Sequence, residues 1–99
     1  MGLEARLYAA LAYAQLGRGT EAAVQAAEVL HEQPGFSAEA WVDNDFYRPG
    51  SSSAALFLDG ARKAGLPICA TAEIAAKFEP GNRLPECEAE RAKVAAPKT

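Results

Sequence analysis

Apolar residues recur every three or four positions over the first third of the chain, a period typical of amphipathic helices. A first helix is predicted over residues 3–16, and its apolar stripe consists of Leu3, Leu7, Leu11 and Ala14. Gly17 is expected to end this helix, because glycine readily adopts the left-handed conformation common at helix ends. A second helix is predicted from its N-cap Thr20 to about Gln33, before a Pro-Gly break. The short connection between the two helices predicts an antiparallel pair.

Shorter helical segments are predicted after this pair. The first covers residues 38–42, the second ends at residue 63, and the third covers residues 72–78. Their expected N-caps are Ser37, one of the serines at 51–53, and Thr71. Residues 43–50 are predicted to form a turn. Residues 88–96 have helical propensity, but Val94 is their one large apolar side chain, so this end is expected to fray.

Composition favours closely packed helices. Alanine accounts for 23 of the 49 apolar residues, whereas Leu, Ile, Val and Phe together number 19. Alanine is the best helix former, and its small side chain lets helix backbones approach each other. The prediction is therefore an all-α fold, in which the antiparallel pair is followed by shorter capping helices. Residues 1–67 are predicted to form the pair and its cap, and residues 68–99 a short helix and a weakly ordered tail.

The charge and hydropathy patterns argue against nucleic acid and membranes as partners. The chain has a formal charge of −3, and residues 1–68 carry five basic and eight acidic side chains. It lacks the stripe of basic residues with interleaved aromatic residues that binds nucleic acid. No apolar run approaches the ~20 residues that cross a bilayer, and the N-terminus lacks the pattern of a signal peptide. A cytoplasmic protein is therefore expected.

Small, aromatic and turn residues recur through the helix pair in a recognisable order. They are Ala10, Tyr13, Gly17, Ala22, Ala26 and Pro34. On these positions residues 3–36 resemble one tetratricopeptide repeat, a helix–turn–helix unit of about 34 residues. The chain departs from that repeat in two places, since the usual first-helix Trp is missing and Val29 replaces the common last small residue. The resemblance implies that the pair needs neighbouring repeats or caps.

Three further phrases extend the resemblance: PGFS at 34–37, FYRP at 46–49 and LDGARKAGLP at 58–67. With the repeat, they are similar to the C-terminal region of a bacterial group that contains class III adenylate and guanylate cyclases and related signalling proteins. The resemblance covers residues 3–67 and implies a last repeat followed by a helical cap. The serines at 51–53 depart from the more acidic helix start expected there. Nothing resembles the cyclase catalytic domain, so no enzymatic activity is implied.

Several aromatic residues are predicted to lie in the capping helices. They are Trp41, Phe46, Tyr47 and Phe57. They could line a binding pocket, or they could close the open end of a helical stack. We favour closure, because the last repeat of a stack leaves an apolar face that needs to be covered.

Few residues carry candidate chemistry. Cys69 and Cys87 are expected to be free thiols in a cytoplasmic protein; a disulfide that fixes the C-terminal segment is the first alternative, and metal or redox chemistry the second. His31 suits the last turn of its helix. Asp43 and Asp45 lack the oxygen-rich loop pattern of a calcium site. We therefore predict no catalytic residue, no metal site and no cofactor.

The function predicted from these observations is a non-catalytic protein-interaction or scaffolding module. Its partner would be another protein or a neighbouring helical repeat, bound along the first helix. The expected contact residues are Glu4, Leu7, Leu11, Ala14 and Gln15. The alternative is a structural cap that self-associates through the exposed edge of the first helix and has no independent ligand. The abrupt start of that helix suggests a piece of a longer protein.

Overall fold

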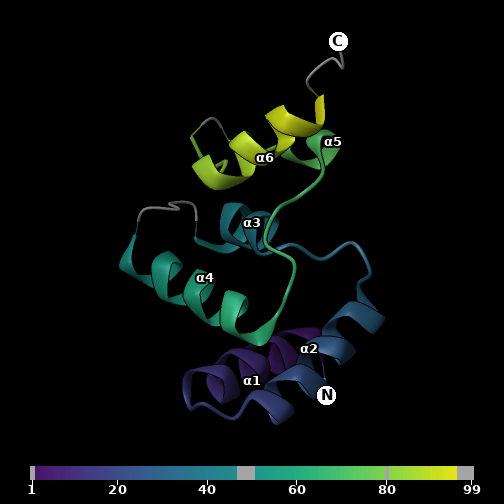
Figure 1. Cartoon of the computed structure of the whole chain (residues 1–99), viewed down its shortest axis with the longest axis vertical. Helices are drawn as coiled ribbons and strands as arrows, with labels where there is room; N and C mark the ends of the chain where they lie inside the picture. Colours follow the sequence, from purple (N-terminus) through teal and green to yellow (C-terminus); the bar gives the residue numbers. More distant parts are fainter. Residues whose placement is uncertain (1, 47–50, 80, 96–99) are drawn as a thin grey trace.

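The computed structural model describes residues 2–46, 51–79 and 81–95. In this part of the chain six α-helices and one short π-helical segment form, without a β-strand, which confirms the all-α fold. The elements are α1 (Leu3–Gln15), α2 (Gly19–Glu32), α3 (Ala38–Trp41), η1 (Val42–Phe46), α4 (Ser52–Ala64), α5 (Ala72–Ala75) and α6 (Pro85–Ala95). Helices α1 and α2 lie at one end of the molecule, and α5 and α6 lie at the other (Figure 1). The turn expected over residues 43–50 is wrong for residues 43–46, which belong to η1, and residues 47–50 lie outside the described residues.

Helices α1 and α2 form the predicted antiparallel pair. Arg6, near the start of α1, lies 3.5 Å from both Glu28 and Glu32 at the end of α2, which fixes the opposite directions of the two helices. Gly17 has a φ of +76°, the left-handed conformation expected of it. The prediction of Thr20 as the N-cap is wrong, because α2 begins at Gly19 with Arg18 at the N-cap position, and Thr20 lies inside the helix. Its buried face consists of Ala22, Ala26 and Val29, so small side chains do form the contact between the two helices.

Helix α4 packs across α1 at a point of close backbone approach. A Cβ atom added to Gly60 would lie 3.2 Å from Cδ2 of Leu11, so glycine leaves the space that Leu11 occupies. Ser51 caps the helix by accepting a hydrogen bond from the amide of Ala54. Gly65 ends it in the left-handed conformation, with a φ of +81°. Ser51 is one of the three serines predicted to cap this helix, and the helix extends to Ala64, one residue beyond its predicted end.

The short helix α3 pairs with the chain that follows α4. Ser37 caps it by accepting a hydrogen bond from the amide of Ala40, as predicted. The two amides after Ser37 donate to carbonyls much later in the chain. Ala38 donates to the carbonyl of Pro67 at 2.9 Å, and Glu39 donates to that of Ile68 at 2.8 Å. These bonds satisfy amides that a helix start leaves free. Residues 67–70 are thereby attached to α3.

The C-terminal segment is where the structure departs most from the sequence prediction. Where fraying was expected, helix α6 extends from Pro85 to Ala95. Leu84 and Cys87 are buried in the same apolar cluster as Leu7 of α1. These two residues thus attach the described part of α6 to the main core, while Ala70, Ala75 and Phe78 form a second, smaller cluster. None of the helices in the described part of the chain has both the length and the apolar character needed to cross a bilayer.

Candidate functional site

The residues predicted to bind a partner do not all reach the surface. Glu4 and Gln15 are exposed, but Leu7, Leu11 and Ala14 are buried. The chain's own helices cover Leu7 and Ala14, which leaves these two unavailable to a partner, whereas Leu11 lines the groove described next. Tyr8, the residue after Leu7, lies on the exposed side of α1 and has an exposed fraction of 40 %.

A groove opens between α1 and α4 on this exposed side. It encloses a cavity of about 520 Å³ lined by Tyr8, Leu11, Ala12, Gln15, Ser53, Leu56 and Phe57. Leu56 has an exposed fraction of 65 %. With Tyr8, it is one of two large apolar side chains that face water in this groove. Hydrophobic side chains at a concave surface are typical of binding sites. We call this surface the α1–α4 groove.

One end of the α1–α4 groove is polar and internally paired. Gln15 donates to Oδ2 of Asp59 at 3.1 Å and accepts from Nζ of Lys63 at 3.0 Å. Lys63 also lies 2.9 Å from Asp59, four residues before it on α4. Hydrogen bonds from Lys63 and Gln15 lower the pKa of Asp59. These groups satisfy one another, so this end of the groove carries no isolated charge.

An aromatic cluster joins α1 to α3 beside the groove. The ring of Tyr8 meets those of Trp41 and Phe57 edge-on, at centroid distances of 6.4 and 6.3 Å. Trp41 donates its indole N–H to the hydroxyl of Tyr8 at 3.4 Å, and its ring lies 6.1 Å from that of Phe36. Trp41 and Phe57 therefore pack against α1, and Phe57 also lines the α1–α4 groove, so the contacts fit both closure of the stack and a binding pocket. The side chains of the other two predicted residues lie outside the described part.

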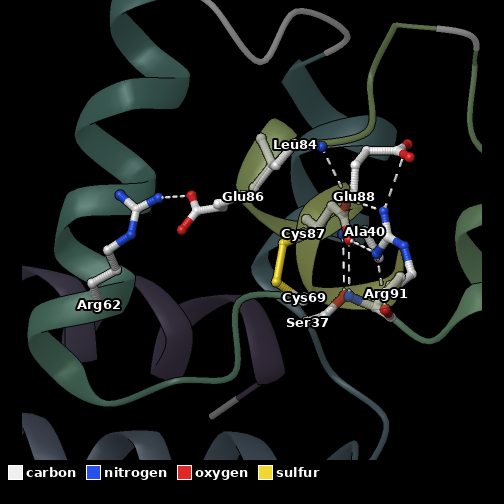
Figure 2. The surroundings of a disulfide bond; sticks show 11 residues. Ser37, Ala40, Arg62, Cys69, Leu84, Glu86, Cys87, Glu88 and Arg91 are labelled. Carbon is white, nitrogen blue, oxygen red and sulfur yellow. Dashed lines mark hydrogen bonds and ion pairs between the residues drawn. A yellow bond between two sulfur atoms is a disulfide. The ribbon is translucent and has the colours of Figure 1, made fainter. Parts of the chain in front are cut away.

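The two cysteines form a disulfide. Cys69, just after α4, is bonded to Cys87 on α6, with the Cα atoms 5.3 Å apart (Figure 2). Sequence analysis favoured free thiols and kept this bond as the first alternative. The pairing depends on α6 returning onto residues 67–70, and no local pattern around either cysteine indicates that return.

A buried carboxylate beside the disulfide was missed by sequence analysis. Glu39 has an exposed fraction of 0 %. It accepts hydrogen bonds from the amides of Ala70 and Leu84, both at 2.9 Å. Arg91 of α6 donates to both carboxylate oxygens, at 2.6 and 2.9 Å, and also to the carbonyl of Ala70. Burial raises the pKa of Glu39, but the hydrogen bonds and the charge of Arg91 outweigh burial and lower it.

The remaining candidate residues from the sequence lie in η1 and α2. Asp43 accepts hydrogen bonds from the amide of Glu79 at 3.1 Å and from the side chain of Asn82 at 2.8 Å, and so ties η1 to the chain before α6. His31 is exposed in the last turn of α2. Across the described ranges, no three His, Cys, Asp or Glu side chains are grouped as a metal site would need.

Comparisons with protein-family models, with curated proteins and with solved structures give no match for this chain. The contacts and surfaces of the chain itself are therefore the basis for proposing a function.

Proposed function

We propose that this chain is a non-catalytic protein-interaction module that binds an amphipathic helix in the α1–α4 groove. The observation that carries the proposal is the pair of water-facing apolar side chains, Tyr8 and Leu56, on the two helices that border one concave surface. A partner helix that covers both would remove apolar area from water, which is the main driving force of most association.

The shape of the groove supports a helix as the occupant. Helices border it on two sides, and its volume of about 520 Å³ leaves room for several apolar side chains. An amphipathic helix places such side chains at i, i+3/i+4 and i+7 along one face, which is how helices dock in apolar grooves. A neighbouring helical repeat would present the same kind of face. The partner we propose is therefore a protein helix with an apolar stripe.

The test uses matched charge substitutions. A displayed library of amphipathic helices is selected against the intact protein, and the selected peptides are measured against Leu56→Glu and Val24→Glu. Val24 is the control, since it is exposed to 57 % on α2, away from the groove. Leu56→Glu should weaken binding by about tenfold or more, because it places an unpaired carboxylate against an apolar face. Val24→Glu should leave binding unchanged.

Other outcomes of this experiment separate the alternatives. Peptides that bind both variants equally well, or a selection that enriches none, would reject the groove as the binding surface. A wild-type protein that dimerises in sedimentation runs, and loses the dimer in Leu56→Glu, would favour the self-associating cap instead.

We propose a bacterial cyclase-like signalling protein as the setting of this module, on its resemblance over residues 3–67 to the C-terminal helical region of that group. That setting is cytoplasmic, where stable disulfides are rare and those that form are usually catalytic or redox-sensing. The state of Cys69 and Cys87 in protein alkylated directly in intact cells reports on this proposal. A disulfide that stays fully formed whatever the redox state of the cell would instead favour an oxidising compartment.

A further inference from the structure

The disulfide joins a fixed part of the fold to a part with fewer attachments. Cys69 lies on the fixed part, because its neighbours on both sides are bound to α3: Pro67 and Ile68 accept from the amides of Ala38 and Glu39, and the amide of Ala70 donates to Glu39. Its partner lies on α6, where Cys87 and the preceding Leu84 are buried in the main core. Along the rest of α6 the side chains are mostly exposed.

Apart from the disulfide, polar contacts attach α6 to the rest of the fold. Arg91 binds Glu39 and the carbonyl of Ala70. Arg62 of α4 pairs with Glu86, and both of these side chains are exposed (Figure 2). Exposed ion pairs contribute little to stability. Loss of the disulfide would therefore leave α6 attached by Leu84, Cys87 and the pair formed by Glu39 and Arg91.

Solvent reaches the two cysteine residues unequally. Cys87 has an exposed fraction of 0 %, whereas Cys69 is half-buried. Cys69 lines an open cavity of about 420 Å³, together with Thr71, Glu90, Arg91 and Val94. A thiolate could approach Sγ of Cys69 from this cavity without prior unfolding, and Cys87 would then be the leaving sulfur. Access of this kind decides which disulfides exchange in folded proteins.

We propose that the Cys69–Cys87 disulfide is a reducible latch for α6, opened by a dithiol reductant that attacks through this cavity. A thiolate of the reductant bonds to Sγ of Cys69, and the bond to Cys87 breaks. The electron pair of that bond leaves on Sγ of Cys87, which takes up a proton. The second thiolate of the reductant then attacks the reductant's first sulfur, the one bonded to Sγ of Cys69. This step closes the disulfide of the oxidised reductant and releases Cys69, which takes up a proton and becomes a thiol. Two electrons and two protons pass to the protein.

The consequence is local opening of α6. The disulfide spans 18 residues, and closing a loop of this length lowers the population of open states on the order of a hundredfold. Reduction raises the population of states in which α6 is open. The α1–α2 pair keeps its own contacts, because it contains neither cysteine. The opened state uncovers the core surface beneath Leu84 and Cys87.

Hydrogen exchange of the whole protein tests the latch. Amides of α6 are compared before and after treatment with dithiothreitol at one pH, with α1 and α2 as the internal reference. We expect exchange in α6 to quicken on the order of a hundredfold, with α1 and α2 unchanged within about twofold. Unchanged α6 exchange after full reduction would overturn the proposal. Equal acceleration in every helix would overturn it too, since the bond would then stabilise the fold globally.

A second variant controls for the reagent. Cys69→Ser/Cys87→Ser lacks the bond, so its α6 should exchange like that of the reduced wild type and should not respond to dithiothreitol. A double variant that fails to fold would show that the whole molecule needs the bond, which contradicts a local latch. Native protein that dithiothreitol reduces only after denaturant is added would exclude attack through the cavity.

Discussion

At the scale of single residues, Glu39 connects the most separate parts of the chain. Its carboxylate accepts bonds from two backbone amides and from both terminal nitrogens of Arg91. A buried charge is tolerated when such bonds replace those it made with water. Removal of one partner costs much more than the pair contributes, because the other charge is left buried without compensation.

Arg91→Ala should therefore lower the free energy of unfolding by about 3–5 kcal/mol. Its matched control is Lys93→Ala, two residues further along α6 at an exposed position, where a change within about ±0.5 kcal/mol is expected. Urea denaturation of both variants gives the comparison. Similar losses in the two would mean that α6 contributes through its helix and not through the buried pair.

At the scale of helices, α4 approaches α1 closely at Gly60. Gly60 leaves space for Leu11 and also for Gln15, whose Nε2 would lie 3.4 Å from an added Cβ. The glycine thus costs helix propensity but allows α4 to approach. The same approach brings Leu56 and Tyr8 to opposite edges of the α1–α4 groove.

Gly60→Val tests this approach. The added side chain should push α4 away from Leu11 and destabilise the protein by about 1–3 kcal/mol through overpacking. Gly19→Val is the control, because Gly19 also lies in a helix but an added Cβ there meets no atom within 4 Å. Thermal denaturation by circular dichroism measures both. Equal melting temperatures for the Gly60→Val and Gly19→Val proteins would contradict the close contact.

Local signals were enough to predict most helices. Ser37, Ser51, Thr71 and Gly65 act where their residue types indicated, because capping depends on residues three or four positions away. Helix α6 was misjudged for the opposite reason. Its anchors are the disulfide and the Glu39–Arg91 pair, which act across the fold, so a count of large apolar residues underestimated its attachment.

At the scale of the whole molecule, the candidate site depends on which helix covers which face. The stripe of Leu7, Leu11 and Ala14 is apolar whether a partner or α4 covers it, so the sequence pattern could not distinguish the two. Tyr8 and Leu56 are far apart in the chain, and each by itself is an ordinary exposed apolar residue. Tertiary packing alone makes them neighbours across a groove.

The whole fold should lose stability in acid through Glu39. Its pKa in the folded protein is lowered, so its contribution is fully present above the ordinary glutamate pKa of about 4.3 and is lost as pH falls through the lower folded value. Denaturant titrations from neutral pH downward should show this loss in the wild type. Glu39→Gln cannot titrate there and should start less stable but fall less steeply. Parallel curves for the two proteins would assign the acid sensitivity to other carboxyl groups.

The partners of Glu39 have a consequence for synthesis on the ribosome. Helices α1 and α2 can pair as soon as both have emerged, since their contacts are local in the chain. Glu39 emerges soon afterwards, but the groups that bind its carboxylate follow 31 to 52 residues later. Until Arg91 has been translated, the carboxylate has to remain in water. A nascent chain of intermediate length therefore carries a complete helix pair beside a core that cannot yet close.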